Sequence, residues 1–337
     1  MTNRTVLVTG ADGFIARQLI VNLLGKGYGV RGTLRDIDRA AALKTTLASY
    51  APVKTLSFVA ADPMSSAGWA DAVRGVDAVF YLATSDDIPD RLNPVRPALE
   101  SVLRVLKAAR DAGVTRVIVT SSVAAVVYGH GSKTRIDPFS ESDWSNLHNG
   151  HVSTHHEAMT RAELAVWDFA MDYPEMEITT INPGEVFGPL LGEDVAFTSN
   201  IVRDLLTGEY SGLPRVGFEG VDVRDVAELH ERALTNDLSI GNRYLCTAGF
   251  LWLRDVAEVL RGEFSDHADK VPTRDLSDIA VRVGALFDRK ASRTATELGL
   301  YTPCSTAKAC SDLGWQPQPA LDAVRATAHS LIAANLV

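Results

Sequence analysis

The sequence has few cysteines, no long apolar run and no excess of basic residues, and each absence excludes a class of protein. Three of the 337 residues are cysteines, and Cys246, Cys304 and Cys310 lack the spacing of a metal site. A disulfide framework is therefore excluded, and a reducing, cytoplasmic location is expected. No apolar run approaches the roughly 20 residues of a membrane span, so we expect no membrane partner.

The balance of charges excludes a further class. Asp and Glu total 42 against 33 Lys and Arg, which gives a net charge of −9, and no basic stripe offsets it. Nucleic acid is therefore not an expected partner. The first four residues run straight into an apolar strand pattern, so we expect no signal peptide. A small molecule is the expected partner, and the sequence leaves open whether the chain is a monomer or a homodimer.

The most informative stretch that is present is Thr5–Ala16. A β-branched strand ends at Gly10, and the apolar spacing of a helix begins after Gly13, at Phe14 and Ile15. Glycines at such a bend let backbone N–H groups approach a pyrophosphate, and the helix N-terminus adds a favourable dipole. The spacing Gly-x-x-Gly-x-x-Ala differs from the usual dinucleotide fingerprint. The alternative is a tight βα turn with no ligand.

Strand and helix patterns alternate through the first part of the chain. The further strands are expected at Tyr28–Leu34, Lys54–Ala60, Ala78–Ala83, Arg116–Ser121 and Glu177–Ile181. The helices between them are expected at Arg39–Tyr50, Ser66–Arg74, Arg96–Ala112 and Ser153–Met171. This rhythm predicts an α/β fold, a Rossmann-type doubly wound parallel sheet with helices on both faces.

The alternation gives way to helical patterns and loops after Pro183. These later helices are expected at Thr198–Leu206, Val223–Ala233 and Trp252–Arg261. We therefore predict two domains. Residues 1–182 form a dinucleotide-binding domain, to which some later segments return, and residues 183–337 mainly form a smaller, α-rich substrate domain.

Three sequence motifs indicate a family. They are Arg31–Asp36 after the second strand, Val221–Ala227 in the second half, and Asp312–Trp315 near the end. With the glycine turn, they make the chain similar to the extended short-chain dehydrogenase/reductases. Within these it most resembles the group of dihydroflavonol reductase, cinnamoyl-CoA reductase and yeast-type carbonyl reductases. The resemblance runs nearly end to end and implies a nicotinamide-dependent oxidoreductase.

The resemblance also implies which residues hold the cofactor. In that family a basic residue at the position of Arg35 binds a 2′-phosphate, helped by a base such as Arg39 or Lys44, so NADP(H) is expected rather than NAD(H). The alternative is that Arg35 is a solvated surface arginine. The other expected contacts are Gly10, Gly13, Phe14 and Ile15 for the pyrophosphate, Asp62 for the adenine, Leu82, Ala83 and Thr84 for the middle of the cofactor, and Pro183 and Val186 for the nicotinamide.

The expected active site departs from the family. The family carries a hydroxyl donor, then Tyr-x-x-x-Lys on the following helix, and an Asn on an earlier helix. Ser122 matches the hydroxyl donor. Alignment of the helix through Thr160–Glu163 puts His155 at the Tyr position and Met159 at the Lys position. Arg104 falls at the Asn position, so three of the four expected groups are replaced.

These replacements favour a cationic reactant. A ketone needs an acid for its developing alkoxide, and lost acid catalysis is worth about 10²–10⁴ in rate. An imine nitrogen is basic enough to be protonated before hydride arrives, and Met159 removes a charge that would repel the resulting cation. Glu185, and less directly Glu157, would stabilise this iminium, while Ser122 and His155 would orient it or manage its proton. The sequence therefore predicts an NADPH-dependent imine reductase, with cyclic imines as the better substrates.

Several alternatives remain open. His155 could serve as the acid of a carbonyl reductase, or His155 or Glu185 as the base of a non-redox isomerase, cyclase or lyase. The altered set could also mark a nucleotide-binding protein without activity. A solvated Glu157 and an Arg104 paired with Glu100 are the structural alternatives for those two residues. The histidines at 148, 151, 155 and 156 lack a cysteine and a diagnostic spacing, so no metal is expected.

Overall fold

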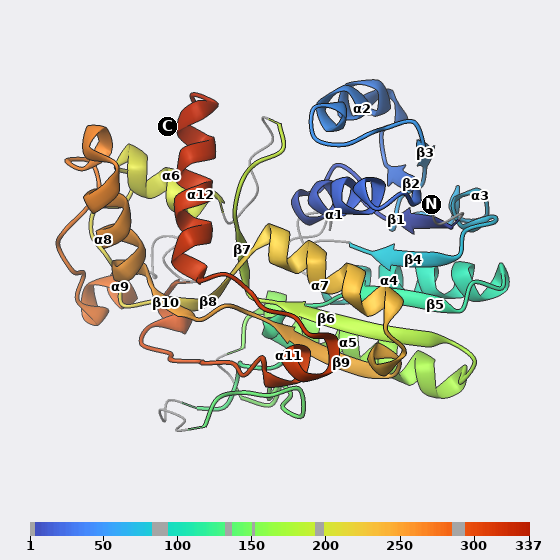
Figure 1. The fold of residues 1–337 in the computed structure, drawn as a ribbon. Helices are drawn as coiled ribbons and strands as arrows, with labels where there is room; N and C mark the ends of the chain where they lie inside the picture. The colour runs from blue at the N-terminus through green and yellow to red at the C-terminus, as the bar shows by residue number, and fades with distance from the viewer. Residues whose placement is uncertain (1–3, 83–93, 132–136, 150–151, 193–198, 285–293) are drawn as a thin grey trace.

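A parallel sheet forms the first half of the molecule (Figure 1). The computed structural model describes residues 4–82, 94–131, 137–149, 152–192, 199–284 and 294–337. Within these residues seven strands follow the order β3-β2-β1-β4-β5-β6-β9, and every neighbouring pair is parallel. The strands are β1 (Thr5–Val8), β2 (Gly29–Leu34), β3 (Leu56–Ala60), β4 (Ala78–Tyr81), β5 (Arg116–Thr120), β6 (Glu177–Pro183) and β9 (Asn242–Cys246). The predicted doubly wound α/β fold is confirmed.

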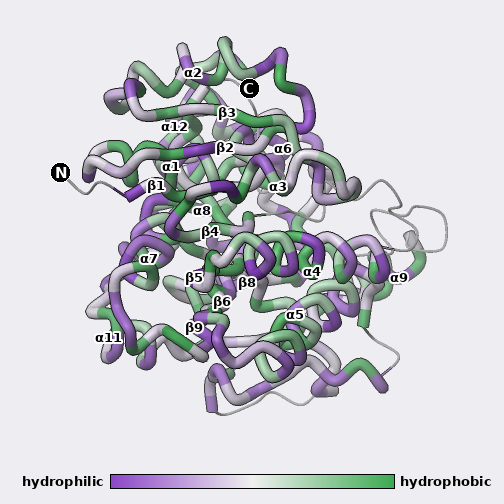
Figure 2. Tube along the Cα trace, turned by 90° about the vertical axis from the view of Figure 1, so that its right-hand side faces the viewer, coloured by the Kyte–Doolittle hydropathy of each residue, from purple (hydrophilic) through white to green (hydrophobic). Residues whose placement is uncertain are grey.

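Helices cover both faces of this sheet, as a doubly wound fold requires. One face carries α1 (Phe14–Gly25), α2 (Ala40–Ala48), α7 (Val223–Thr235) and α11 (Ala307–Leu313). The other face carries α3 (Trp69–Val73), α4 (Val95–Asp111) and α5 (Thr154–Asp172). Figure 2 shows the two helix layers on either side of the strands, with α1, α7 and α11 on the left and α3, α4 and α5 on the right. Each face therefore has its own apolar core.

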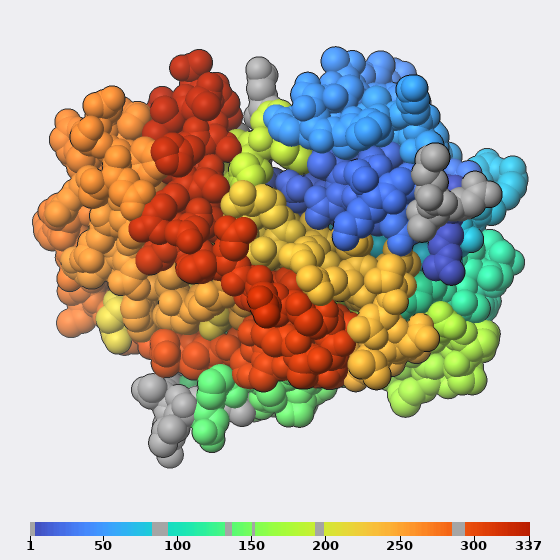
Figure 3. Space-filling view, in the orientation of Figure 1, coloured from blue at the N-terminus to red at the C-terminus, as the bar shows by residue number. Residues whose placement is uncertain are grey.

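A second, smaller sheet lies in the C-terminal half. It has the order β10-β8-β7 and is made of β7 (Glu185–Phe187), β8 (Gly217–Asp222) and β10 (Phe250–Trp252). Its core is shared with α6 (Ser199–Thr207), α8 (Leu253–Glu263) and α12 (Ala320–Ala333). Figure 3 shows this C-terminal part, orange and red, beside the blue N-terminal part. A further short helix, α9 (Asp278–Gly284), follows α8.

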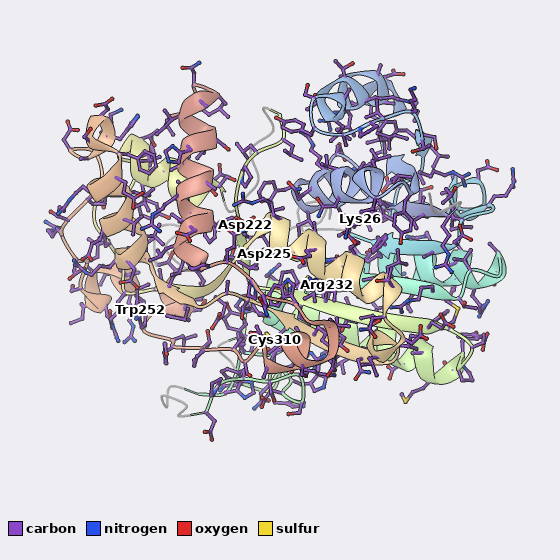
Figure 4. All side chains as sticks on the ribbon, viewed as in Figure 1. Lys26, Asp222, Asp225, Arg232, Trp252 and Cys310 are labelled. Atoms are coloured by element: carbon purple, nitrogen blue, oxygen red, sulfur yellow. The ribbon has the colours of Figure 1, made fainter. Side chains whose placement is uncertain are left out.

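The loops expected between the later helices are in part strands, so that expectation is wrong. Those stretches contain the strands β8 to β10, and β9 completes the large sheet beside β6; β7 lies in the loop expected directly after Pro183. Strand β8 also runs directly into α7, where Asp222 accepts a hydrogen bond from the N–H of Arg224 (Figure 4). Among the described helices, none combines the length and apolar character that a membrane crossing needs.

Candidate active site

The turn between β1 and α1 lies at the carboxyl end of β1, an interior strand of the large sheet. Gly10 has a positive φ of 58°, and its N–H donates to the hydroxyl of Thr33 at 3.0 Å. Gly13 is the N-cap of α1, and its N–H donates to the carbonyl of Gly10 at 2.8 Å. After β3 the chain crosses to β4 on the other side of β1. This is the switch point at which doubly wound sheets bind ligands.

A small cavity opens beside this turn. Its lining residues are Thr9, Gly10, Asp12, Thr33, Arg35, Ala61 and Pro63. Arg35 follows β2 directly and is exposed, so the cavity has a guanidinium at the end of this strand. The neighbouring Asp36 accepts a hydrogen bond from the N–H of Asp38, so its carboxylate caps the short 3₁₀ turn that follows. The cavity therefore combines backbone of the glycine turn with a cation, which fits an anionic nucleotide.

The loops after β3 and β4 border the same switch point. Asp62 accepts a hydrogen bond from the N–H of Met64 at 2.8 Å, and its own carbonyl accepts one from the indole of Trp69. The N–H of Leu82 donates to the hydroxyl of Thr9 at 2.8 Å. The predicted cofactor contacts Ala83 and Thr84 lie outside the described residues.

Ser122 lies just beyond β5, where its hydroxyl accepts a hydrogen bond from the N–H of Ala124 at 3.1 Å. The side-chain amide of Asn182, at the end of β6, donates to the carbonyl of Ser122 at 3.1 Å. The half-buried Ser122 is thus held at the carboxyl edge between two parallel strands.

A buried carboxylate ties α5 to this edge. The oxygens of Glu163 accept hydrogen bonds from Ser121 and Asn182, each at 2.6 Å. They also accept one from Nε of Arg243 at 2.6 Å. Because Glu163 is fully buried, these donors fix the rotation of α5 against the strand ends. In the sequence Glu163 serves only to align the helix with the family. A charged residue on an otherwise apolar helix face is the signal that could have indicated a buried, hydrogen-bonded carboxylate.

Helix α5 begins after Ser153, whose hydroxyl accepts a hydrogen bond from the N–H of His156. His155 and Met159 follow one helical turn apart and are both half-buried, at the border of the buried face. His156 is buried instead, and its ring stacks on Tyr128 with the centroids 3.4 Å apart. Its Nε2 lies 3.6 Å from a carboxylate oxygen of Glu297. In the sequence His156 stands only in a histidine cluster from which no metal is expected, and nothing there indicates this stack.

Two candidate residues have partners that bear on the roles expected of them. Glu157 pairs with Arg161 at 2.7 Å on the outer part of α5, so its carboxylate is neutralised one turn along the helix. Glu100, the other residue considered as a partner of Arg104, pairs with Arg96 at 2.6 Å. The guanidinium of Arg104 donates to the carbonyl of Pro63 instead. Arg104 therefore contacts a cavity-lining loop, and the alternative in which it pairs with Glu100 is not what the structure shows.

The predicted nicotinamide contacts lie where β6 passes into β7. Pro183 ends β6, while Glu185 and Val186 belong to β7, which pairs with β8. Gly184 lies between them, and a Cβ there would come within 2.3 Å of the carbonyl oxygen of Glu219. Glu185 is half-buried and Val186 is buried. The close approach of two backbones thus requires glycine at the middle of this turn.

Glu219 on β8 is a buried acid that sequence reasoning missed. Burial raises the pKa of Glu219 to about 7, although the N–H of Cys304 donates to one carboxyl oxygen at 2.8 Å and so opposes the rise. The pattern of residues 217–222 indicates a loop rather than a strand, which hides the burial of this side chain. Among the described residues, no group of three or more His, Cys, Asp or Glu is arranged to hold a metal.

The doubly wound sheet, with a glycine turn at its switch point, defines a nucleotide-binding α/β protein. Residues 6–246 match the NAD dependent epimerase/dehydratase family, and the chain belongs to that family. Cinnamoyl-CoA reductase 1 of Petunia hybrida is 31% identical over 326 residues, which cover 95% of this chain and 96% of that protein. The ketoreductase azaE of Aspergillus niger is 31% identical over 311 residues, 86% of this chain and 91% of that protein. The resemblance to the extended short-chain dehydrogenase/reductases is confirmed.

Solved structures agree on the fold. The NADPH complex of Gre2 from Candida albicans is similar with a TM-score of 0.79 and 25% identity, over 98% of this chain and 99% of that one. The NADPH complex of yeast Gre2, a methylglyoxal/isovaleraldehyde reductase, has a TM-score of 0.79 at 22% identity, over 99% and 100% of the two chains. At that identity the second likeness concerns the fold alone.

Proposed function

We propose that this protein is an NADPH-dependent reductase whose better substrates are imines, cyclic ones in particular, rather than ketones. The reductase class is supported by the family and by relatives named as cinnamoyl-CoA reductase and ketoreductase. The cofactor is supported by the cavity that joins the glycine turn to Arg35 and by similar structures that hold NADPH. The residues present fit that group, which supplies a hydride when bound.

The observation that carries the imine proposal is the register of α5. Glu163 is anchored to Ser121 and Asn182, which sets how the helix faces the strand ends. Met159 lies one helical turn before Glu163 and His155 two turns before it. Both are therefore at the border of the buried face of α5. The family alignment assigns these places to a lysine and a tyrosine. The chain therefore offers an apolar thioether and an imidazole where a ketone reductase needs a cation and a phenol.

The charges that remain suit a cationic substrate. An iminium ion already carries its proton, so no strong acid is required while the C=N bond is reduced. Glu185 is the candidate counter-charge, because it is half-buried beside the Pro183–Gly184 turn. Glu157 is a weaker candidate because Arg161 neutralises it. Ser122 would accept or donate a hydrogen bond to orient the substrate, and His155 would exchange the proton of the amine product with solvent.

The test compares a cyclic imine with its ketone counterpart, each with NADPH. We expect the imine to be reduced with the higher kcat/KM. Glu185→Gln is expected to lower imine turnover, whereas Glu175→Gln, an exposed glutamate between α5 and β6, is the charge-matched control. The double substitution His155→Tyr and Met159→Lys is expected to shift the preference toward the ketone. Faster ketone than imine reduction by the unmodified protein would contradict the proposal.

The second candidate is a carbonyl reductase that uses His155 as its acid. The names of the relatives favour it, since both are reductases of carbonyl substrates by name. In that case ketone reduction would depend on His155, which would donate the proton to the developing alkoxide. A protein that binds NADPH but oxidises it with neither substrate class would instead indicate a non-redox isomerase, cyclase or lyase, or a binding protein.

A further inference from the structure

Asp12 brings a carboxylate to the same cavity as Arg35. It is the residue before Gly13 in the glycine turn, and it lines the cavity at the end of β2. Its Oδ2 accepts a hydrogen bond at 2.5 Å from Nη1 of Arg39, which lies in the 3₁₀ turn after β2. Both side chains reach solvent, with 31% of Asp12 and 50% of Arg39 exposed. An ion pair therefore stands beside the proposed phosphate site.

The backbone of Asp12 is held in place independently of this pair. Its carbonyl accepts a hydrogen bond from Nε of Arg17 at 3.0 Å, and Arg17 also donates to the carbonyl of Leu191 at 2.8 Å. Because Arg17 is buried, its hydrogen bonds hold the backbone of the turn, and the turn cannot move the Asp12 carboxylate away from the cavity. The carboxylate thus stays near the cavity, whichever cation it contacts.

This arrangement sets two anions in competition for one cation. A 2′-phosphate at the end of β2 would be attracted to Arg35 and Arg39, as guanidinium groups favour phosphate. Asp12 already engages Arg39, and a carboxylate within a Debye length of about 8 Å also repels a phosphate directly. The exposed ion pair is weak, but a phosphate that recruits Arg39 must still break it. Once Arg39 contacts the phosphate, the carboxylate of Asp12 lies beside the phosphate without its cation.

We propose that Asp12 is a specificity-determining residue of the cofactor site, which holds Arg39 and weakens the selection of a 2′-phosphate over a 2′-hydroxyl. This inference rests on the proposed use of NADPH. The chain therefore discriminates between NADPH and NADH less sharply than its two arginines alone would allow. Replacement of Asp12 by a neutral isostere releases Arg39 and removes the repulsion.

The test uses 2′,5′-ADP and 5′-AMP, which differ only in the 2′-phosphate, with affinities measured by titration calorimetry. Asp12→Asn is expected to raise the affinity for 2′,5′-ADP by about 5- to 20-fold and to change that for 5′-AMP by less than about 2-fold. The matched control is Asp111→Asn, which removes an exposed carboxylate paired with Arg110 at the end of α4. That control is expected to leave both affinities unchanged, and melting curves verify the fold of each variant.

A double-mutant cycle with Arg39→Ala separates the inference from the proposed function. If Asp12 occupies Arg39, then Arg39→Ala weakens 2′,5′-ADP more in the Asp12→Asn background than in the unmodified chain. Equal binding of 2′,5′-ADP and 5′-AMP by the unmodified chain would contradict the proposed NADPH preference, while a gain on Asp12→Asn would still support this inference. Unchanged or weaker binding of 2′,5′-ADP by Asp12→Asn would overturn it.

Discussion

The carboxylate of Glu163 lies 2.6 Å from Nε of Arg243, and both side chains are buried, with 0% and 9% exposed. The guanidinium of Arg243 also stacks over the ring of Trp144, 3.6 Å from its centroid. Glu163 belongs to α5 and Arg243 to β9, so this pair joins the helix that carries His155 to the edge strand of the large sheet. The buried pair therefore fixes where α5, and with it His155, lies against the sheet.

Removal of one partner of this pair should destabilise the fold. Arg243→Met leaves the Glu163 carboxylate buried without its cation, and we expect a loss of about 3–5 kcal/mol in the free energy of unfolding. Urea denaturation measures this loss. The control on the same helix is Arg161→Met, which breaks the exposed pair with Glu157 and should cost about 0–1 kcal/mol. Equal losses in the two variants would show that the buried pair is not an anchor.

Glu219 should make the stability of the protein fall as the pH rises. Its pKa is about 7 in the folded protein, against the ordinary value of 4.5 that a glutamate has in the unfolded chain. Between these two values the folded state holds a proton that the unfolded state has released, so unfolding becomes easier with each step up in pH. The unmodified protein should lose about 3 kcal/mol relative to Glu219→Gln between pH 4.5 and pH 8.

The measurement for Glu219 is chemical denaturation of both proteins across that pH range. The comparison removes the contribution of Asp225, whose pKa is also raised by burial, to about 6, and which is present in both proteins. Asp225 lies in the first turn of α7 (Figure 4). Parallel stability curves for the two proteins would mean that folding does not raise the pKa of Glu219.

His230 should act in the opposite direction. Its Nδ1–H donates to the carbonyl of Val226 at 2.8 Å, so its Nε2 accepts from the hydroxyl of Thr120 at 2.7 Å. Full burial lowers the pKa of His230 from 6.5 to about 4. Below pH 6.5 the unfolded chain gains a proton that the folded protein excludes, so stability is lost as the pH falls toward 4.

The variant His230→Asn tests this expectation. Its loss of stability relative to the unmodified protein should be greatest above pH 6.5 and should shrink by about 1.4 kcal/mol per pH unit below it. Denaturation curves at pH 4.5, 5.5, 6.5 and 7.5 measure the trend. A difference that stays constant with pH would contradict a neutral, buried imidazole.

The large sheet could be predicted because its strands are marked locally. Buried parallel strands are continuous apolar runs, and helix stops such as Gly25-Lys26-Gly27 separate them from the helices. The strands after Pro183 lack that signal. Glu219, Gly220 and Asp222 interrupt β8, and β7 has only three residues, so their pairing depends on contacts between distant segments. Local patterns could not show those contacts.

The candidate site was predictable only where the family alignment reached it. The glycine turn, Arg35 and Ser122 follow strands whose ends are clear in the sequence. The partners of charged side chains were not predictable, because a charged residue on a helix can pair with neighbours in the same helix or with groups on other elements. For Arg104 a pair with Glu100, four residues before it, was one alternative, but its guanidinium contacts the carbonyl of Pro63 in another loop. The register of α5 likewise depends on Arg243, eighty residues further along the chain.

The last prediction concerns Gly32, on β2 beneath the glycine turn. A Cβ at this position would lie 2.6 Å from Cβ of Ala11 and 2.9 Å from the ring of Phe58. Gly32→Ala must therefore displace Ala11 and the turn that follows Gly10. We expect a loss of about 1–3 kcal/mol in stability from this overpacking.

The displaced turn should also bind nucleotide more weakly. We expect the Kd for NADPH to rise about 10-fold or more, because the backbone N–H groups of a preorganised turn lose their alignment with the pyrophosphate. Titration calorimetry at a temperature below the melting transition measures the Kd, and a melting curve measures the stability. The control is Gly25→Ala at the end of α1, where an added Cβ meets nothing within 4 Å. NADPH affinity in Gly32→Ala equal to that of Gly25→Ala would place the pyrophosphate away from this turn.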